Sequence, residues 1–107
     1  MRQGFVMGAP QWKNIYELSS EQIYKLEEAE EKMESMEINE AEKILLQLLE
    51  EDQNCIPFLN IIAHLNGRYL SDFETAIGYY DKVLNLEPDN AWARDERRRY
   101  RRYVSYD

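Results

Sequence analysis

The chain has little of the residue types that build disulfides and metal sites. Among its 107 residues there is one cysteine, Cys55, and one histidine, His64. One cysteine cannot form an internal disulfide, which fits a reducing compartment. One Cys and one His also fall short of the four ligands of a structural zinc site. We therefore expect no disulfide, no metal and no cofactor.

Long apolar runs are missing as well. No stretch approaches the roughly 20 apolar residues that a helix needs to span a bilayer. The apolar segment within residues 1–7 is too short for a secretion signal. We expect a complete, cytoplasmic chain that makes no membrane contact, and 107 residues suffice for one domain with a small core.

Signatures of catalysis are also absent. The sequence shows no nucleophile with a paired base, no cluster of metal ligands and no phosphate-binding glycine loop. Residues 17–52 carry 13 Asp or Glu against three Lys, but without the apolar surroundings that acid–base catalysis needs. We expect that this protein is not an enzyme. This acidic block is either a solvated helix face or a surface for a basic partner.

The chain does have strong helical periodicity and no strand pattern. Apolar residues recur at helical spacing, and capping residues mark three helix starts: Ser19 with Gln22, Asp72 and Asn90. The expected helices cover residues 20–37, 40–51, 57–66, 73–86 and 91–104, with a turn at 38–39, an end at Asn66-Gly67 and a further short helix at 11–18.

Two of these helices repeat one pattern. Ala41, Leu45 and Leu48 have the same offsets as Ala76, Tyr80 and Val83, and the two sets lie 35 residues apart. Pro88 follows the second set and closes its helix pair. A small residue, an aromatic and a turn proline at this spacing resemble the second helix of a tetratricopeptide repeat (TPR).

The resemblance implies an all-α fold of antiparallel helix pairs, stacked as a short right-handed TPR-like solenoid. It divides the chain into an N-terminal segment with a capping helix (1–19), two helix pairs (20–90) and a basic C-terminal helix (91–107). Two repeats fall short of the usual minimum of about three, so we expect the flanking segments, with Trp12 and Trp92, to cover the open ends.

TPR modules bind other proteins, and the first helix of each repeat lines their ligand groove. If Phe58, Ile61, Ile62 and Leu65 pack inward, another face of the same helix remains for a partner. The predicted partner-binding residues on that face are Ile56, Leu59, Asn60, Ala63 and Asn66. The alternative is that the flanking helices cover this face.

The last helix carries a second candidate surface, in which two tyrosines are interleaved among arginines over residues 97–103. Its predicted partner-binding residues are Arg98, Arg99, Arg101, Arg102 and Tyr103. Such a surface suits an acidic protein, a second copy of this chain or RNA, whereas the alternative is a solvated cap with arginines near a helix C-terminus. The net charge of −8 argues against nucleic acid for the chain as a whole.

These observations predict a protein–protein interaction module, an adaptor, scaffold or small subunit of a larger complex. A partner would fill an apolar helical groove, and charged rims would set its orientation. Two alternatives remain open: a protein that self-assembles through its acidic and basic ends, and an RNA-associated accessory protein. The sequence names no partner.

Overall fold

The computed structural model describes residues 16–104, and these form helices and turns with no strand. The elements in chain order are α2 (Ser20–Glu34), α3 (Ile38–Glu51), α4 (Ile56–His64), the π-helix η1 (Leu65–Tyr69), α5 (Phe73–Leu86) and α6 (Ala91–Val104). The all-α prediction is confirmed. Most of the predicted helix at 11–18 lies outside the described residues, and residues 16–17 form a turn.

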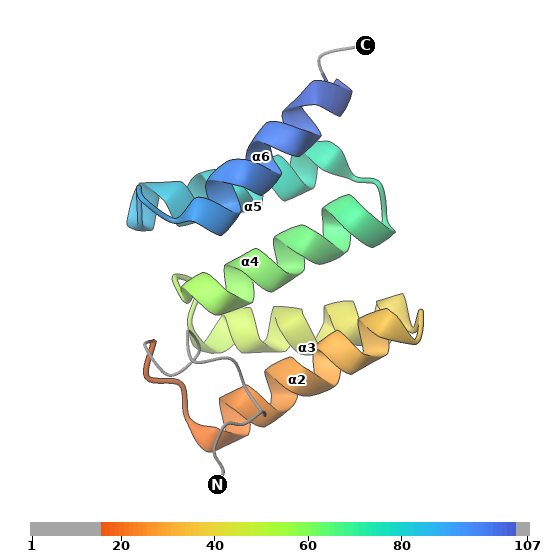
Figure 1. Ribbon diagram of the computed structural model, residues 1–107. Helices are drawn as coiled ribbons and strands as arrows, with labels where there is room; N and C mark the ends of the chain where they lie inside the picture. Colours follow the sequence, from red (N-terminus) through yellow and green to blue (C-terminus); the bar gives the residue numbers. More distant parts are fainter. Residues whose placement is uncertain (1–15, 105–107) are drawn as a thin grey trace, which may run out of the picture.

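Each helix packs mainly on its neighbours in the sequence, α2 on α3, α4 on α5 and α5 on α6. Figure 1 shows consecutive helices running in roughly opposite directions, so the chain rises layer by layer from α2 to α6. This arrangement is helical-repeat-like, as the internal period predicted. None of the described helices is both long and apolar enough to cross a membrane.

The start of α2 matches the sequence prediction, and its end does not. Ser19 Oγ accepts from the Gln22 amide at 3.1 Å while Gln22 Oε1 accepts from the Ser19 amide at 2.9 Å, which completes the capping box. The helix ends at Glu34 rather than near residue 37. Met36 adopts a left-handed φ of 65°, with its amide donating to Met33 and the next amide, of Glu37, donating to Lys32. These two bonds form a Schellman cap.

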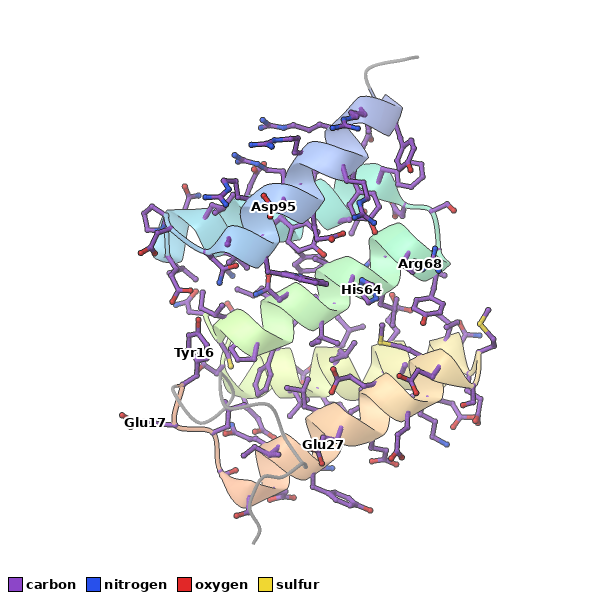
Figure 2. All side chains as sticks on the ribbon, viewed as in Figure 1. Tyr16, Glu17, Glu27, His64, Arg68 and Asp95 are labelled. Carbon is purple, nitrogen blue, oxygen red and sulfur yellow. The ribbon has the colours of Figure 1, made fainter. Side chains whose placement is uncertain are left out.

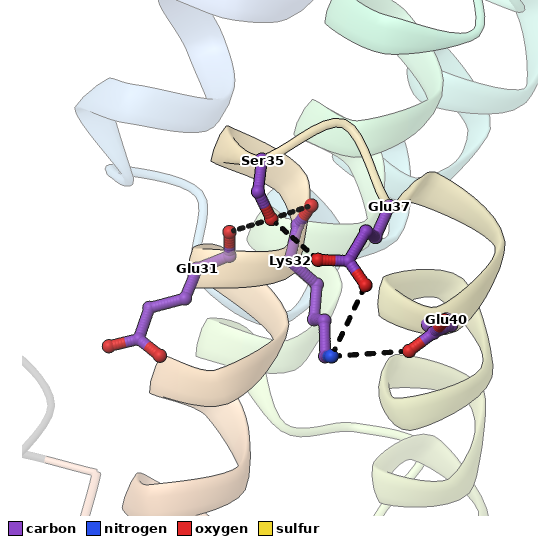
Figure 3. A network of polar contacts seen from close by, with 5 residues as sticks. All are labelled: Glu31, Lys32, Ser35, Glu37 and Glu40. Carbon is purple, nitrogen blue, oxygen red and sulfur yellow. Dashed lines mark hydrogen bonds and ion pairs between the residues drawn. The ribbon is translucent and has the colours of Figure 1, made fainter.

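Side chains reinforce this turn (Figure 3). Lys32 Nζ lies 3.4 Å from Glu37 Oε1 and 3.2 Å from Glu40 Oε1, and Ser35 Oγ donates to Glu37 Oε2 at 3.0 Å. The hydrogen bond from Ser35 and the nearby ammonium lower the pKa of Glu37, while the carboxylates, Glu40 first, raise that of Lys32. Because the turn occupies residues 35–37, α3 begins at Ile38, and the predicted turn at 38–39 is wrong.

The largest departure from the sequence prediction is at Asn66 and Gly67. These residues were expected to end the third helix, but the chain continues through them as η1. Gly67 is buried against the ring of Tyr100 on α6, and a Cβ at this position would lie 2.5 Å from Tyr100 Cζ. Gly67 therefore serves a close tertiary contact and does not terminate the helix.

The caps predicted for the last two helices are confirmed. Asp72 Oδ1 accepts from the Thr75 amide at 3.3 Å, and Asn90 Oδ1 accepts from the Ala93 amide at 2.9 Å. Each bond satisfies a backbone donor in the first helical turn that has no partner within its helix.

The core consists of two apolar clusters, one centred on α2–α3 and the other on α4–α5. The repeated sets are buried in equivalent ways: Ala41, Leu45 and Leu48 in the first cluster, and Ala76, Tyr80 and Val83 in the second. Each of the six is at most 1% exposed. Residues 35 positions apart in the sequence are therefore buried at equivalent places in the two clusters.

Candidate functional site: a groove across alternate helices

A groove of about 800 Å³ crosses α2, α4 and the start of α6. We call it the α2–α4–α6 groove. Its described lining residues are Tyr16, Glu30, Asn60, Ile61, His64, Glu87, Asp89, Asn90, Ala91 and Trp92. Helices α3 and α5 contribute none of them. The groove is thus formed on alternate helices, the first members of successive helix pairs.

A hydrogen-bonded network fixes one end of the groove. The Tyr16 hydroxyl donates to Glu87 Oε1 at 2.7 Å, and Asn90 Nδ2 donates to the same oxygen at 2.7 Å. Burial, followed by the hydrogen bond to Glu87, raises the pKa of Tyr16 to about 12. Since Asn90 also caps α6, this network ties the start of the described chain to the α5–α6 turn, 71 residues later.

Asn60 is a buried side chain with no hydrogen-bond partner for its amide oxygen among the described residues. It is 9% exposed, and it lines the groove from the middle of α4. Buried amide oxygens in native proteins are almost always paired, because an unpaired one costs about 1–3 kcal/mol. The unpaired amide oxygen of Asn60 therefore needs an explanation, and a bound ligand is one.

His64 and Trp92 supply the aromatic surface of the groove. Their ring centroids are 5.9 Å apart at an interplanar angle of 60°, and the ring of Tyr69 also packs on His64, with centroids 6.0 Å apart. Burial lowers the pKa of His64, so the imidazole is neutral at pH 7. Trp92, by contrast, is 48% exposed. Figure 2 shows His64 near the end of α4 and Tyr16 near its start.

The predicted partner-binding residues of α4 and η1 are mostly interior. Ile56, Leu59 and Ala63 belong to the second core cluster, and Asn66 Nδ2 donates to the Ile62 carbonyl at 2.9 Å. The flanking helices thus cover this face, which was the alternative interpretation. Of the five predicted residues, Asn60 alone lines the groove.

The residues of α4 that face the groove differ from the predicted ones because the helix is rotated relative to the expectation. Ile61 was expected to pack fully inward with Phe58, Ile62 and Leu65, but it is only half-buried and lines the groove. The sequence did hold a signal for this face: Asn60 and His64 are polar residues at i and i+4 on an otherwise apolar helix. Tyr16, Glu87 and Trp92 had no such signal, because only the fold brings them together.

The arginines of α6 form a separate surface. Arg94, Arg97, Arg98, Arg101 and Arg102 line an open depression of about 470 Å³, which we call the arginine face. Nitrogen-tipped side chains project from α6 on this side (Figure 2).

Pairing on α6 is uneven. Arg97 Nη1 lies 2.7 Å from Asp81 Oδ1, and Arg99 pairs at 3.8 Å with Glu96. Among residues 16–104, Arg98 and Arg101 form no ion pair. The ring of Tyr103, the fifth predicted residue, packs on Phe73 with centroids 4.9 Å apart. The four predicted arginines are exposed, and they lie at the opposite end of the stack from α2.

Other reactive groups are inert or dispersed. Cys55 is buried at the start of α4, and burial raises the pKa of its thiol to about 11, so the thiolate is not formed at neutral pH. Within the described part of the chain no three His, Cys, Asp or Glu side chains come together as metal ligands.

The chain matches no protein-family model, no curated protein and no solved structure.

Proposed function

We propose that this protein is a TPR-like protein-binding module of the cytoplasm, an adaptor or small subunit of an assembly. Its α2–α4–α6 groove receives a segment of a partner protein. The observation that supports this most directly is the groove itself, where an exposed Trp92 and the orphaned amide of Asn60 face the same space.

The size and lining of the groove suit such a role. Ligand sites are usually clefts of about 300–1,000 Å³ with an apolar and aromatic lining and a few polar groups. Here Ile61, Ala91 and Trp92 provide the apolar part, and the amides of Asn60 and Asn90 are the uncharged polar groups. Exposed tryptophan is also a residue type that often dominates binding energy at interfaces.

A second candidate function is self-assembly through unlike charges, and the arginine face favours it. The exposed Arg98 and Arg101 have no internal counter-charge within residues 16–104, while the acidic block of residues 17–52 belongs mainly to α2 and α3. Joining the two surfaces head to tail would be a heterologous contact, which forms rings or filaments. RNA is a third ligand class for the same face.

Affinity isolation from the native cell with two matched variants tests the groove proposal. Trp92→Ala alters the groove, whereas Tyr24→Ala removes an exposed aromatic of α2 that does not line it. We expect a stoichiometric protein to be recovered with the wild type and Tyr24→Ala, and lost with Trp92→Ala. Equal recovery by all three would contradict the groove as the binding site, and recovery of nuclease-sensitive material alone would favour RNA.

A further inference from the structure

The α2–α4–α6 groove has a one-sided charge. Its described lining includes three carboxylates, Glu30 from α2 and Glu87 and Asp89 from the α5–α6 turn, and neither Lys nor Arg. His64 adds no positive charge at pH 7 because burial keeps it neutral. The carboxylates belong to segments on both sides of α4. A ligand in the groove therefore has carboxylates on two sides, whereas Arg68 and Arg99, whose charges act on His64, are not among the lining residues.

We infer that the groove selects a partner segment by one cationic side chain, an arginine or a lysine, seated between these carboxylates on the indole of Trp92. This inference rests on the proposed function of the groove and adds the chemical class of the ligand. An acidic segment would meet like charges on both sides, which disfavours it by repulsion.

The residues of the groove match the parts of such a side chain. The exposed indole of Trp92 is the best natural face for a cation, within about 6 Å of the ring centroid. Ile61 and Ala91 offer apolar surface for the aliphatic stem, which long basic residues bury while the charged group stays polar.

Glu87 can serve the ligand without losing its structural role. Its carboxylate accepts from Tyr16 and from Asn90, and the two oxygens of an ionised carboxylate offer about four acceptor positions. The Asn60 amide, which has no hydrogen bond among the described residues, is then the neutral polar group left for the backbone of the bound segment. Charge and orientation thus come from different residues.

A selection experiment tests the inference. A random peptide library is displayed on phage and selected on the full-length protein, with counter-selection on Trp92→Ala. We expect groove-dependent peptides to share one fixed Arg or Lys. Groove-dependent peptides without a basic residue would overturn the cationic ligand while leaving the binding module intact. No groove-dependent peptide at all would overturn both.

Two matched controls then separate charge from shape. Replacing the fixed Arg of a selected peptide by citrulline, or a fixed Lys by norleucine, removes the charge and keeps the length. We expect affinity to fall about tenfold or more, with the loss shrinking at high salt.

On the protein, Glu30→Gln with Asp89→Asn should weaken binding in the same way. Glu31→Gln changes a carboxylate of α2 that does not line the groove, and it should not affect binding. Unchanged affinity of the neutral peptide, or equal losses for the groove and control variants, would refute the inference.

Discussion

At the scale of single residues, small side chains decide where helices approach. Gly67 touches the ring of Tyr100, which is itself held by Phe73 at 5.6 Å and Tyr80 at 6.4 Å between ring centroids. Gly78 in α5 is exposed, and a Cβ there meets nothing within 4 Å. The two glycines have opposite roles despite their similar positions within helical segments.

We predict opposite effects for the same substitution at these sites. Gly67→Ala should lower the free energy of unfolding by about 1–3 kcal/mol, because the stacked Tyr100 cannot move aside cheaply. Gly78→Ala should raise it by about 0.5–1 kcal/mol through helix propensity. Chemical denaturation of both variants measures this, and a neutral Gly67→Ala would mean that α6 does not pack against η1 as described.

His64 predicts a pH dependence of stability. Burial lowers its pKa from the ordinary 6.5, against the opposing effect of Glu96 on α6 and Glu30 on α2, while Arg68 and Arg99 act in the same direction as burial. Below about pH 6.5 the unfolded chain therefore binds a proton that the folded chain does not, and stability falls as the pH decreases.

Thermal unfolding tests this when it is measured from about pH 7.5 to about pH 5, a range that brackets the ordinary pKa of histidine. The wild type should lose more stability across this interval than His64→Gln, which has no titrating ring. Parallel curves for the two proteins would show that His64 is not desolvated in the fold.

At the scale of elements, the sequence predicted the three helix starts that a side chain caps, because Ser19, Asp72 and Asn90 are local acceptors. The start of α3 was predicted two residues late, whereas the ends of α3, α5 and α6 at residues 51, 86 and 104 were predicted correctly. The predicted ends of α2 and α4 were wrong for two reasons. Met36 terminates α2 in the left-handed conformation without being a glycine, and Gly67, which suggested a terminus, is needed for contact with Tyr100. The second reason is tertiary, so no local rule could reveal it.

The Schellman cap at Met36 provides a test at this scale. Its side chain is 66% exposed, so substitution removes little packing. Met36→Gly should be more stable than Met36→Val by about 1–2 kcal/mol, since a β-branched residue is strained at positive φ and glycine is not. Urea unfolding of the pair decides the matter. A valine variant as stable as the glycine variant would contradict the left-handed turn.

The candidate site follows the same division between local and tertiary information. Of the residues predicted on the last helix, Arg98, Arg101 and Arg102 line the arginine face, and Arg99 and Tyr103 do not. The match is partial, although all of these residues lie on one helix. On α4 the sequence pattern indicated a helix that does line the groove, but most of the predicted residues are interior, since Leu59 and Ala63 are buried in the second core cluster. The groove joins residues as distant as Tyr16 and Glu87, and only the stacking of helices brings them together.

At the scale of the whole molecule, charge is separated along the stack, from acidic α2 and α3 to the arginine face of α6. Changing Arg98 and Arg101 to Gln should leave helical content unchanged and weaken any salt-sensitive association, because neither side chain has an internal ion pair within residues 16–104. Arg97→Gln is the contrast: it breaks the pair with Asp81 and should cost up to about 1 kcal/mol of stability.

Analytical ultracentrifugation at low salt and at about 1 M salt, where the Debye length is about 3 Å, shows whether the protein self-assembles through unlike charges. Self-assembly through unlike charges requires larger species at low salt that disappear with high salt and with the double variant. A wild type that sediments as a monomer under both conditions would exclude self-assembly and leave the arginine face for another acidic partner.

We propose the groove on α2, α4 and α6 as the place where a partner binds. The most direct measurement is the footprint of a selected peptide on the full-length protein, observed by NMR chemical shifts during titration. We predict that the largest changes fall on the Trp92 indole N–H, the Asn60 side-chain amide and the Ile61 amide, three groups in the groove wall. Changes centred instead on the arginine face, or on exposed Leu46 and Leu86 of α3 and α5, would contradict the claim.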